Sequence, residues 1–332
     1  LAMPSVHAVP GDDFGVNMSE APTGLDVAIT GHALDISGVL RRKPAAGGKA
    51  PGKESIQPFR ISVKLDKLAL EDGVAISSFK LDAGGTGRHP ARLSATGSLG
   101  KSSSIAISVT AGSDQRHLTA MAGDAGMLIR GLFGYAIVKG GELSLLATMP
   151  SVAAAGNQSN SQYSGDLRIL DCTILNQPFL ARLFSSGSFG GFLDLLRGEG
   201  IALDAVNIPF QISGDVITIH DARASGPSIG VTAAGYVDRA TDRIALQGAL
   251  APLYGINGLL GAIPVLGDVF VSKKGEGIFG VTYSVSGDIS DPTVSTNPLS
   301  VLAPGILRRL FEGSAPKAPP PSAPSPAVRP HQ

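Results

Sequence analysis

The fold of this chain is decided by the stretch Val206-Asn207-Ile208-Pro209-Phe210-Gln211-Ile212-Ser213. Apolar residues occupy every second position, and this period of two is typical of a β-strand with one dry and one wet face. The same alternation returns at Ile217/Ile219, Ile229/Val231/Ala233, Ile244/Leu246/Leu250 and Val281/Tyr283/Val285. Short turn signals separate these stretches, and short connections join antiparallel neighbours. Residues 201–290 therefore predict an antiparallel meander with one continuous apolar face.

The composition favours an aliphatic protein. The 332 residues could form two ordinary domains or one extended domain. Charged residues make up 16 % and aromatic residues 5 %, with no Trp, and the mean hydropathy is +0.20. Because 27 basic residues balance 27 acidic ones, there is no electrostatic reason to expect nucleic acid as a partner.

Neither cysteine nor histidine is arranged as in a metal or redox site. A single cysteine, Cys172, excludes an internal disulfide and a Cys-rich metal site. It alternates with Leu170 and Ile174, which predicts a buried, inert thiol. The six histidines are scattered without metal-ligand spacing. We therefore expect no metal and no cofactor.

Residues 24–122 predict further antiparallel strands, which we interpret as a β-groove segment. Small polar turn residues separate most of them, and 43–53 reads as a solvated loop. The preceding segment 1–23 is polar and has no period, so we expect it to be irregular. The strand signals are Leu25/Val27/Ile29, Leu34/Ile36, Phe59/Ile61/Val63/Leu65, Val74/Ile76, Leu93/Ala95/Leu99 and Ile105/Ile107/Val109.

In residues 123–312 a short apolar helical pattern leads, through a Gly-containing turn, into a strand three times. Asp124 and Ser188 are placed to cap the first and second helices, and 178–184 predicts an additional one. Such short helices need an apolar surface to be stable. The three patterns are Met127/Leu128/Leu132/Tyr135, Phe189/Phe192/Leu193/Leu196 and Ile256/Leu259/Leu260/Ile263.

The C-terminal part of the sequence predicts one more helix and a disordered tail. The helical pattern begins at Asn297-Pro298, and Pro304-Gly305 predicts a kink in it. Residues 313–332 are rich in Pro, Ala and Ser, which predicts disorder with polyproline II character.

No segment reads as a signal peptide or a membrane span. The opening Leu-Ala-Met-Pro lacks a charged n-region and an apolar h-region, so we expect the chain to be a piece of a longer protein. The longest uncharged run lies between Arg243 and Asp268. Its prolines and glycines favour a strand followed by a short apolar helix over a membrane span.

Three motifs associated with catalysis occur in the wrong structural context. The G-x-S-x-G match at 226–230 lies in a turn between strands, whereas a nucleophile elbow needs a strand, a sharp turn and a helix. The G-x-G-x-x-G match at 275–280 leads into a strand instead of a helix. The S-x-x-K match at 77–80 alternates like a strand. We expect no enzyme, and a serine esterase using Ser228 stays only a remote alternative.

A series of short motifs runs in order along the C-terminal part of the sequence. They are Ser188-Phe189-Gly190-Gly191-Phe192-Leu193, Gly200-Ile201-Ala202-Leu203-Asp204, Gly214-Asp215-Val216-Ile217-Thr218-Ile219, Gly235-Tyr236-Val237-Asp238, Ile263-Pro264-Val265-Leu266-Gly267, Val285-Ser286-Gly287-Asp288-Ile289-Ser290-Asp291-Pro292 and Asn297-Pro298-Leu299. In this order, from about residue 123 to 313, the chain resembles the C-terminal region of AsmA-like proteins (the AsmA, TamB and YhdP group). The order of helices and strands is the specific part of the resemblance.

The resemblance implies a large envelope protein of Gram-negative bacteria. Such proteins have an N-terminal inner-membrane helix and a long, taco-shaped β-groove that crosses the periplasm, and they are thought to pass phospholipid between the two membranes. The anchor has no counterpart in this chain, which is consistent with a C-terminal fragment. The implied partners are phospholipid acyl chains and, at the C-terminal end, a membrane surface or an outer-membrane partner.

On this interpretation the fold is a mainly-β antiparallel meander that forms a curved groove, with a few short amphipathic helices capping it. The apolar strand positions would line the groove: Val206, Ile208, Phe210, Ile212, Ile229, Val231, Val281 and Val285. Without the resemblance, the alternation favours a closed core between two sheets. With it, the open groove is favoured.

The apolar helices have two possible roles. They could cap the exposed end of the sheet, which is the commoner role, or meet a membrane. The residues concerned are Leu259, Leu260, Ile263, Leu302, Ile306, Leu307, Arg308 and Arg309. The competing hypothesis for the whole protein is an envelope scaffold or assembly factor that binds partner proteins at a strand edge.

Overall fold

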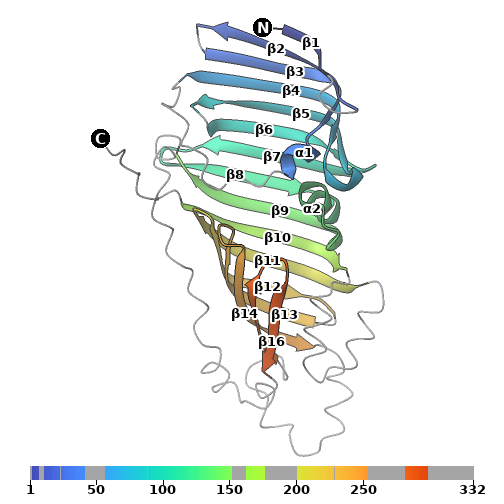
Figure 1. Cartoon of the computed structure of the whole chain (residues 1–332), viewed down its shortest axis with the longest axis vertical. Helices are drawn as coiled ribbons and strands as arrows, with labels where there is room; N and C mark the ends of the chain where they lie inside the picture. The colour runs from blue at the N-terminus through green and yellow to red at the C-terminus, as the bar shows by residue number, and fades with distance from the viewer. Residues whose placement is uncertain are drawn as a thin grey trace, which may run out of the picture.

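A computed structural model of the chain describes residues 2–6, 11–22, 24–41, 57–87, 89–151, 162–175, 200–227, 229–252 and 281–297. These residues form one sheet whose strands follow one another in sequence order (Figure 1). The strands are β1 (Ala2–Val6), β2 (Asp13–Ala21), β3 (Gly24–Asp35), β4 (Pro58–Ala69), β5 (Ala75–Thr86), β6 (His89–Leu99), β7 (Ser103–Ala111), β8 (Gln115–Ala122), β9 (Val138–Pro150), β10 (Gln162–Ile174), β11 (Ile201–Ser213), β12 (Val216–Ser225), β13 (Ile229–Asp238), β14 (Arg243–Pro252), β15 (Val281–Asp288) and β16 (Pro292–Asn297).

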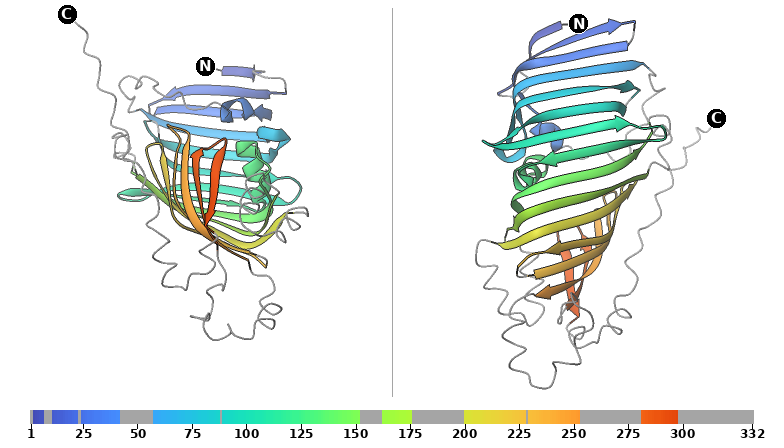
Figure 2. Two further views of the ribbon diagram at one scale, coloured as in Figure 1. Left: turned by 60° about the horizontal axis from the view of Figure 1, so that its bottom comes forward. Right: turned by 180° about the vertical axis from the view of Figure 1, so that it is seen from behind.

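The predicted mainly-β meander is confirmed, and the sheet is open and not strongly curled (Figure 2). All neighbouring strands pair antiparallel except β3 and β4, which run parallel with Leu25 opposite Phe59. A parallel pair needs a longer crossover than a hairpin, and this one contains the short helix α1 (Ser37–Leu40). The expectation of antiparallel pairing throughout 24–122 is wrong at this one step.

The expectation that 1–23 is irregular is also wrong, because β1 and β2 lie there. In β2 the apolar residues Phe14, Val16 and Met18 do alternate, with Gly15 and Asn17 between them. This pattern has only three apolar positions, and acidic and small residues flank it, so the alternation was too short to predict a strand. Two further strands, β8 and β16, were likewise not predicted.

The first of the predicted helices is confirmed as α2 (Ala125–Phe133). Asp124 caps it as expected, because its carboxylate accepts a hydrogen bond from the Met127 amide at 2.8 Å. The helix ends at Gly134, whose φ of 73° places it in the left-handed region that glycine adopts most readily. Tyr135 therefore lies beyond the helix. A 3₁₀ turn, η1 (Glu71–Gly73), packs beside it.

The other predicted helices lie outside the residues that the structure describes. These are the helical patterns at 178–184, 189–196, 256–263 and 299–310, together with the Pro-rich tail 313–332.

Candidate functional site

The strand register aligns one unbroken row of apolar residues across the first eleven strands. Each member lies directly opposite the next on the neighbouring strand, so all of them share one face of the sheet. Neighbouring strands are about 4.8 Å apart, so the ten spacings between the eleven strands span roughly 48 Å. The row is Met3, Val16, Ile29, Val63, Leu81, Ala95, Ile107, Ala120, Leu145, Leu167 and Ile208. We call the side that carries it the apolar face.

The opposite side of the same strands, which we call the polar face, is mostly hydrophilic. The neighbouring row there is Thr30, Lys64, Lys80, Thr96, Ala106, Met121, Ser144, Arg168 and Asn207. Arg168 donates hydrogen bonds to Asp166 at 2.8 Å and to Asn207 at 3.0 Å. This is the pattern of a sheet with one solvated and one dry side.

The apolar face continues into the C-terminal strands. A bulge in β12 shifts the register, because Asn207 lies opposite Arg223 whereas Phe210 lies opposite Ile219. The buried clusters of the N-terminal and C-terminal strands meet at Leu143, which packs against both. The two clusters therefore belong to one apolar surface.

Helix α2 covers this face at one end of the strands. A Cβ on Gly126 would lie 2.5 Å from the Val138 carbonyl oxygen, and one on Gly131 would lie 2.8 Å from Leu70 Cδ1. Gly126 lets the helix approach β9 closely, and Gly131 lets it approach Leu70 and Val74, which flank η1. Beneath it Leu99 and Ile105 are only 1 % and 5 % exposed. We call this side the sealed end.

Ion pairs fix the elements that cover the sealed end. The Nε atom of Arg41, which follows α1, donates to both carboxylate oxygens of Glu71 at 2.8 and 2.7 Å. The Nε atom of Arg130 in α2 donates to one carboxylate oxygen of Asp72 in η1, and its Nη2 atom donates to the Asp72 carbonyl oxygen at 3.3 Å. The Glu71 side chain is largely buried, so its pair is less screened by solvent than the exposed Arg130–Asp72 pair.

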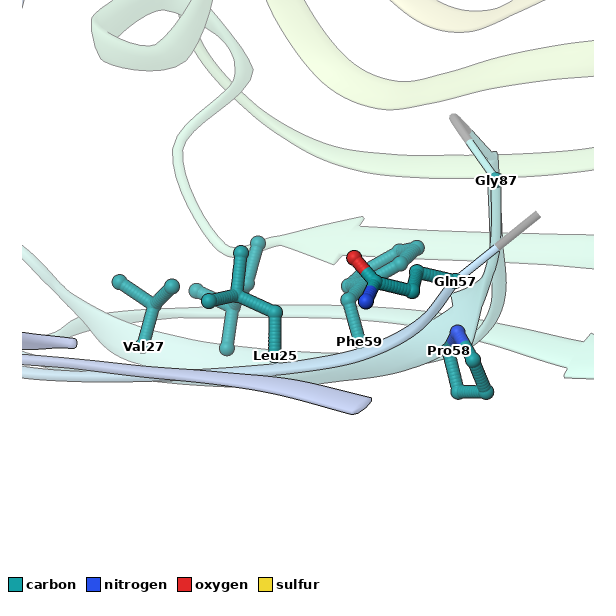
Figure 3. Close-up of a pocket in the computed structure, with 7 residues that line it drawn as sticks. Leu25, Val27, Gln57, Pro58, Phe59 and Gly87 are labelled. Carbon is teal, nitrogen blue, oxygen red and sulfur yellow. The ribbon is translucent and has the colours of Figure 1, made fainter. Parts of the chain in front are cut away.

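At the other end of the strands, which we call the open end, the apolar face is less completely buried, although Val109 there is 6 % exposed. Leu93, Leu118 and Phe210 are all partly exposed there. An open apolar cavity of about 330 Å³ lies at the same end of the sheet, over β3 and β4 (Figure 3). Its lining residues are Leu25, Val27, Gln57, Pro58, Phe59, Ile61 and Gly87. The alternation marked most of these as strand residues but gave no reason to assign them to a site.

A buried arginine closes part of the open end. Arg116 is 4 % exposed and lies opposite Ala111 and Met149 on the apolar face. Its guanidinium donates to the carbonyl oxygens of Pro150 at 2.9 Å and Pro90 at 2.8 Å. These bonds link strand ends of β6, β8 and β9 and satisfy two of its donors. No sequence pattern indicated this role.

The structure divides the predicted groove residues into two groups. Ile208, Phe210 and Ile212 of β11 are half-buried. Ile229 and Val285 are 2 % and 3 % exposed and belong to the packed core. Val206 and Val231 pack against that same core. Val281 of β15 lies opposite Leu250 of β14, but the side chain of Val281 is not among those that the structure describes.

None of the predicted cap or membrane helix residues falls within the described residues. They are Leu259, Leu260, Ile263, Leu302, Ile306, Leu307, Arg308 and Arg309. Ser228 and the motif at 275–280 also lie outside the described residues.

Tyr283 of β15 links β15 to β13 by a hydrogen bond across β14. Its place in the alternation did not indicate this role. Tyr283 lies opposite Gly248, and its hydroxyl reaches across β14 to donate a hydrogen bond to the Thr232 carbonyl oxygen at 2.8 Å. A Cβ on Gly248 would lie 2.9 Å from that hydroxyl. Burial raises the pKa of Tyr283 to about 12.

The remaining chemical groups show no catalytic arrangement within the described ranges. His220 and Asp221 are exposed, and Asp221 pairs with Arg223 at 2.6 Å. The residues 77–80 belong to β5, and the described residues include no group of His, Cys, Asp or Glu that could hold a metal ion. Cys172 is 3 % exposed, and burial raises the pKa of its thiol, as the predicted inert thiol requires.

Comparison with known proteins gives no relative for this chain. No protein-family model, no curated protein and no solved structure matches it. In the described part of the chain, no helix combines the length and apolarity needed to cross a membrane.

Proposed function

We propose that this chain is a non-enzymatic lipid-handling protein whose apolar face holds the acyl chains of phospholipids. The observation that carries the proposal is the row of eleven apolar residues on one side of a single open sheet. A second sheet facing it is not among the described elements. An aliphatic surface of this length, half-buried along the open end, offers apolar contact without any directional group.

The energetics favour such a surface as a path for lipid. Exposing a chain of about 16 carbons to water costs about 0.8 kcal/mol per methylene, on the order of 12 kcal/mol in total. Contact with aliphatic side chains removes much of this cost, while the headgroup remains solvated. The process needs no acid, base, nucleophile or metal.

The resemblance to AsmA-like proteins supplies the proposed cellular setting. In that setting the chain is the C-terminal part of a periplasmic conduit between the inner and outer membranes, anchored to the inner membrane by a segment outside this sequence. The sheet would then form one wall of a curved groove, α1 and α2 would cap it at the sealed end, and the C-terminal end would meet a membrane surface or an outer-membrane partner.

Native mass spectrometry of the chain purified from cells tests the proposal. Ile208→Asp places a charge on the half-buried apolar face, whereas Asn207→Asp places the same charge on the polar face one residue away. We expect wild type and Asn207→Asp to carry phospholipid and Ile208→Asp to lose most of it, with all three folded by circular dichroism. If all three carry equal amounts of lipid, or if Ile208→Asp unfolds, the face is not an open lipid surface.

The open edges of the sheet favour a second candidate, an envelope scaffold that binds proteins by strand addition. Within the described sheet β1 and β16 each pair with one neighbour only, which leaves one side of each strand available for a partner strand. Proline substitutions at alternate positions of β16 distinguish the candidates. A scaffold would lose its protein partner, whereas a lipid surface would keep its phospholipid.

A further inference from the structure

A second cavity lies at the same strand end as the apolar one, but it is lined by Asp26, Arg60 and Arg92 of the polar face and so has a different chemical character. Its volume is about 420 Å³, and it shares Pro58 and Phe59 with the apolar cavity. Pockets of a few hundred cubic ångströms are of the size that binds small ligands. The remaining lining residues are Asp26, Arg60, Gly84, Gly85, Thr86, Ala91, Arg92 and Ala111.

Two arginines converge on this cavity from alternate strands. Arg60 of β4 lies opposite Gly84 of β5, which lies opposite Arg92 of β6, so their Cα atoms are roughly 10 Å apart. A Cβ on Gly84 would lie 3.4 Å from Arg92 Nε, 3.6 Å from its Nη2 and 3.4 Å from the Phe59 carbonyl oxygen. The Arg92 guanidinium therefore lies over Gly84, between its own strand and the strand of Arg60.

Neither guanidinium group has an ion-pair partner among the described residues. Both are permanently charged, and neither forms an ion pair or hydrogen bond with any described residue. Arg168 and Arg223, by contrast, pair with Asp166 and Asp221. Asp26 lies opposite Arg60 and lines the cavity without forming an ion pair. Two positive charges and one negative charge leave a net charge of one positive unit.

We propose that this cavity is a binding site for an oxyanion group, with phosphate as the chemical class. Guanidinium groups hydrogen-bond phosphate oxygens in a planar, two-pronged geometry, and here two of them approach one space from both sides of a glycine. The Thr86 hydroxyl, which also lines the cavity, adds a further donor. Gly84 has no side chain to separate the arginines.

The neighbouring apolar cavity indicates the source of the phosphate. The two cavities share Pro58 and Phe59 at the ends of the strands. A lipid whose chain contacts Leu25 and Ile61 on the apolar face would have its headgroup at this strand end, and the headgroup would pass around Pro58 and Phe59 to reach Arg60 and Arg92 on the polar face. The lipid source rests on the proposed function, whereas the oxyanion site does not.

Calorimetric titration of the whole chain tests the site with three probes: dodecyl phosphate, dodecyl maltoside and inorganic phosphate. The test variant is Arg60→Gln/Arg92→Gln. The control is Lys64→Gln/Lys80→Gln, which removes the same charge from the same face. Lys64 and Lys80 are exposed, lie opposite each other on β4 and β5, and do not line the cavity.

We expect the arginine variant to bind dodecyl phosphate about tenfold or more weakly, since hydrogen bonds to charged groups are lost. Binding of dodecyl maltoside should not change, and the lysine control should keep its dodecyl phosphate affinity within about twofold. If the arginine variant binds dodecyl phosphate as tightly as the wild type, or if the lysine control loses as much affinity, the proposed oxyanion site is ruled out.

Inorganic phosphate separates the two sources of the anion. Weaker binding of inorganic phosphate than of dodecyl phosphate, with the same dependence on the arginines, supports the lipid headgroup. Equal affinity for both overturns the lipid source and keeps a site for free anions. If neither dodecyl compound binds while phosphate still binds through the arginines, the proposed function fails and the oxyanion site stands.

Discussion

The sealed and open ends of the sheet carry the same kinds of residue on the same strands, yet the sealed end is packed more closely. On β6, Leu99 at the sealed end is 1 % exposed, whereas Leu93 at the open end is half-buried. Both side chains lie on the apolar face. What differs is the covering element, because α2 packs over Leu99 and its neighbours. Coverage, and not residue type, separates core from accessible surface in this molecule.

The largest expected effect comes from truncating the same residue type at the two ends. Leu99→Ala removes a fully packed side chain and should lower the free energy of unfolding by about 2–5 kcal/mol. Leu93→Ala removes a half-exposed one and should cost about 1 kcal/mol. Urea unfolding measures both. Equal losses would mean that the two ends are packed alike, and the comparison would fail.

Alkaline pH should weaken the core of the C-terminal strands through Tyr283. Its pKa is raised to about 12 in the folded chain, so the folded state holds the phenolic proton more tightly than the unfolded state. The stabilisation is fully present below pH about 10, is lost as the pH rises to about 12, and amounts to about 2–3 kcal/mol.

Unfolding free energies measured across this pH range, with tyrosinate absorbance, check the prediction. Tyr283→Phe should remove most of this pH dependence and cost about 1 kcal/mol at neutral pH through the lost bond to Thr232. Tyr135→Phe serves as the control, since Tyr135 is 65 % exposed. If Tyr283 ionises near pH 10, as an unburied phenol does, its burial in the core would be contradicted.

A smaller effect is expected from loosening α2 at its N-terminus. Asp124→Ala removes the cap on the Met127 amide and should cost about 1 kcal/mol. Hydrogen exchange should then rise at the sealed end, in β7 and β9, more than at the open end. Asp114→Ala, in the exposed turn between β7 and β8, controls for charge. If Asp124→Ala raises hydrogen exchange equally at both ends of the strands, α2 does not seal one end.

Much of the fold could be predicted because the alternation of apolar and polar residues identifies most of its strands. Over most of β4, β7 and β11 bulky apolar residues occupy every second position, and period two then specifies both the strand and its apolar face. In β16 Val294 is the only bulky aliphatic residue, so no period is visible. The parallel pairing of β3 and β4 depends on the path of their connection, which local pattern does not determine.

The division of the apolar face could not be predicted in the same way. Ile208 and Ile229 occupy equivalent positions in the alternation, but one is half-buried and the other is 2 % exposed. The difference arises from packing between strands far apart in the sequence. Arg60 and Arg92 are likewise neighbours only through the register with Gly84, which the sequence does not specify.

Photo-crosslinking along β10 tests the central claim most directly. A photoreactive residue is placed in turn at Tyr163, Ser164, Leu167 and Arg168, of which Tyr163 and Leu167 lie on the apolar face and Ser164 and Arg168 on the polar face, and crosslinked phospholipid is measured in cells. The account predicts lipid adducts at 163 and 167 and none above background at 164 and 168. Adducts at all four positions, or at none, would contradict an apolar face that holds acyl chains.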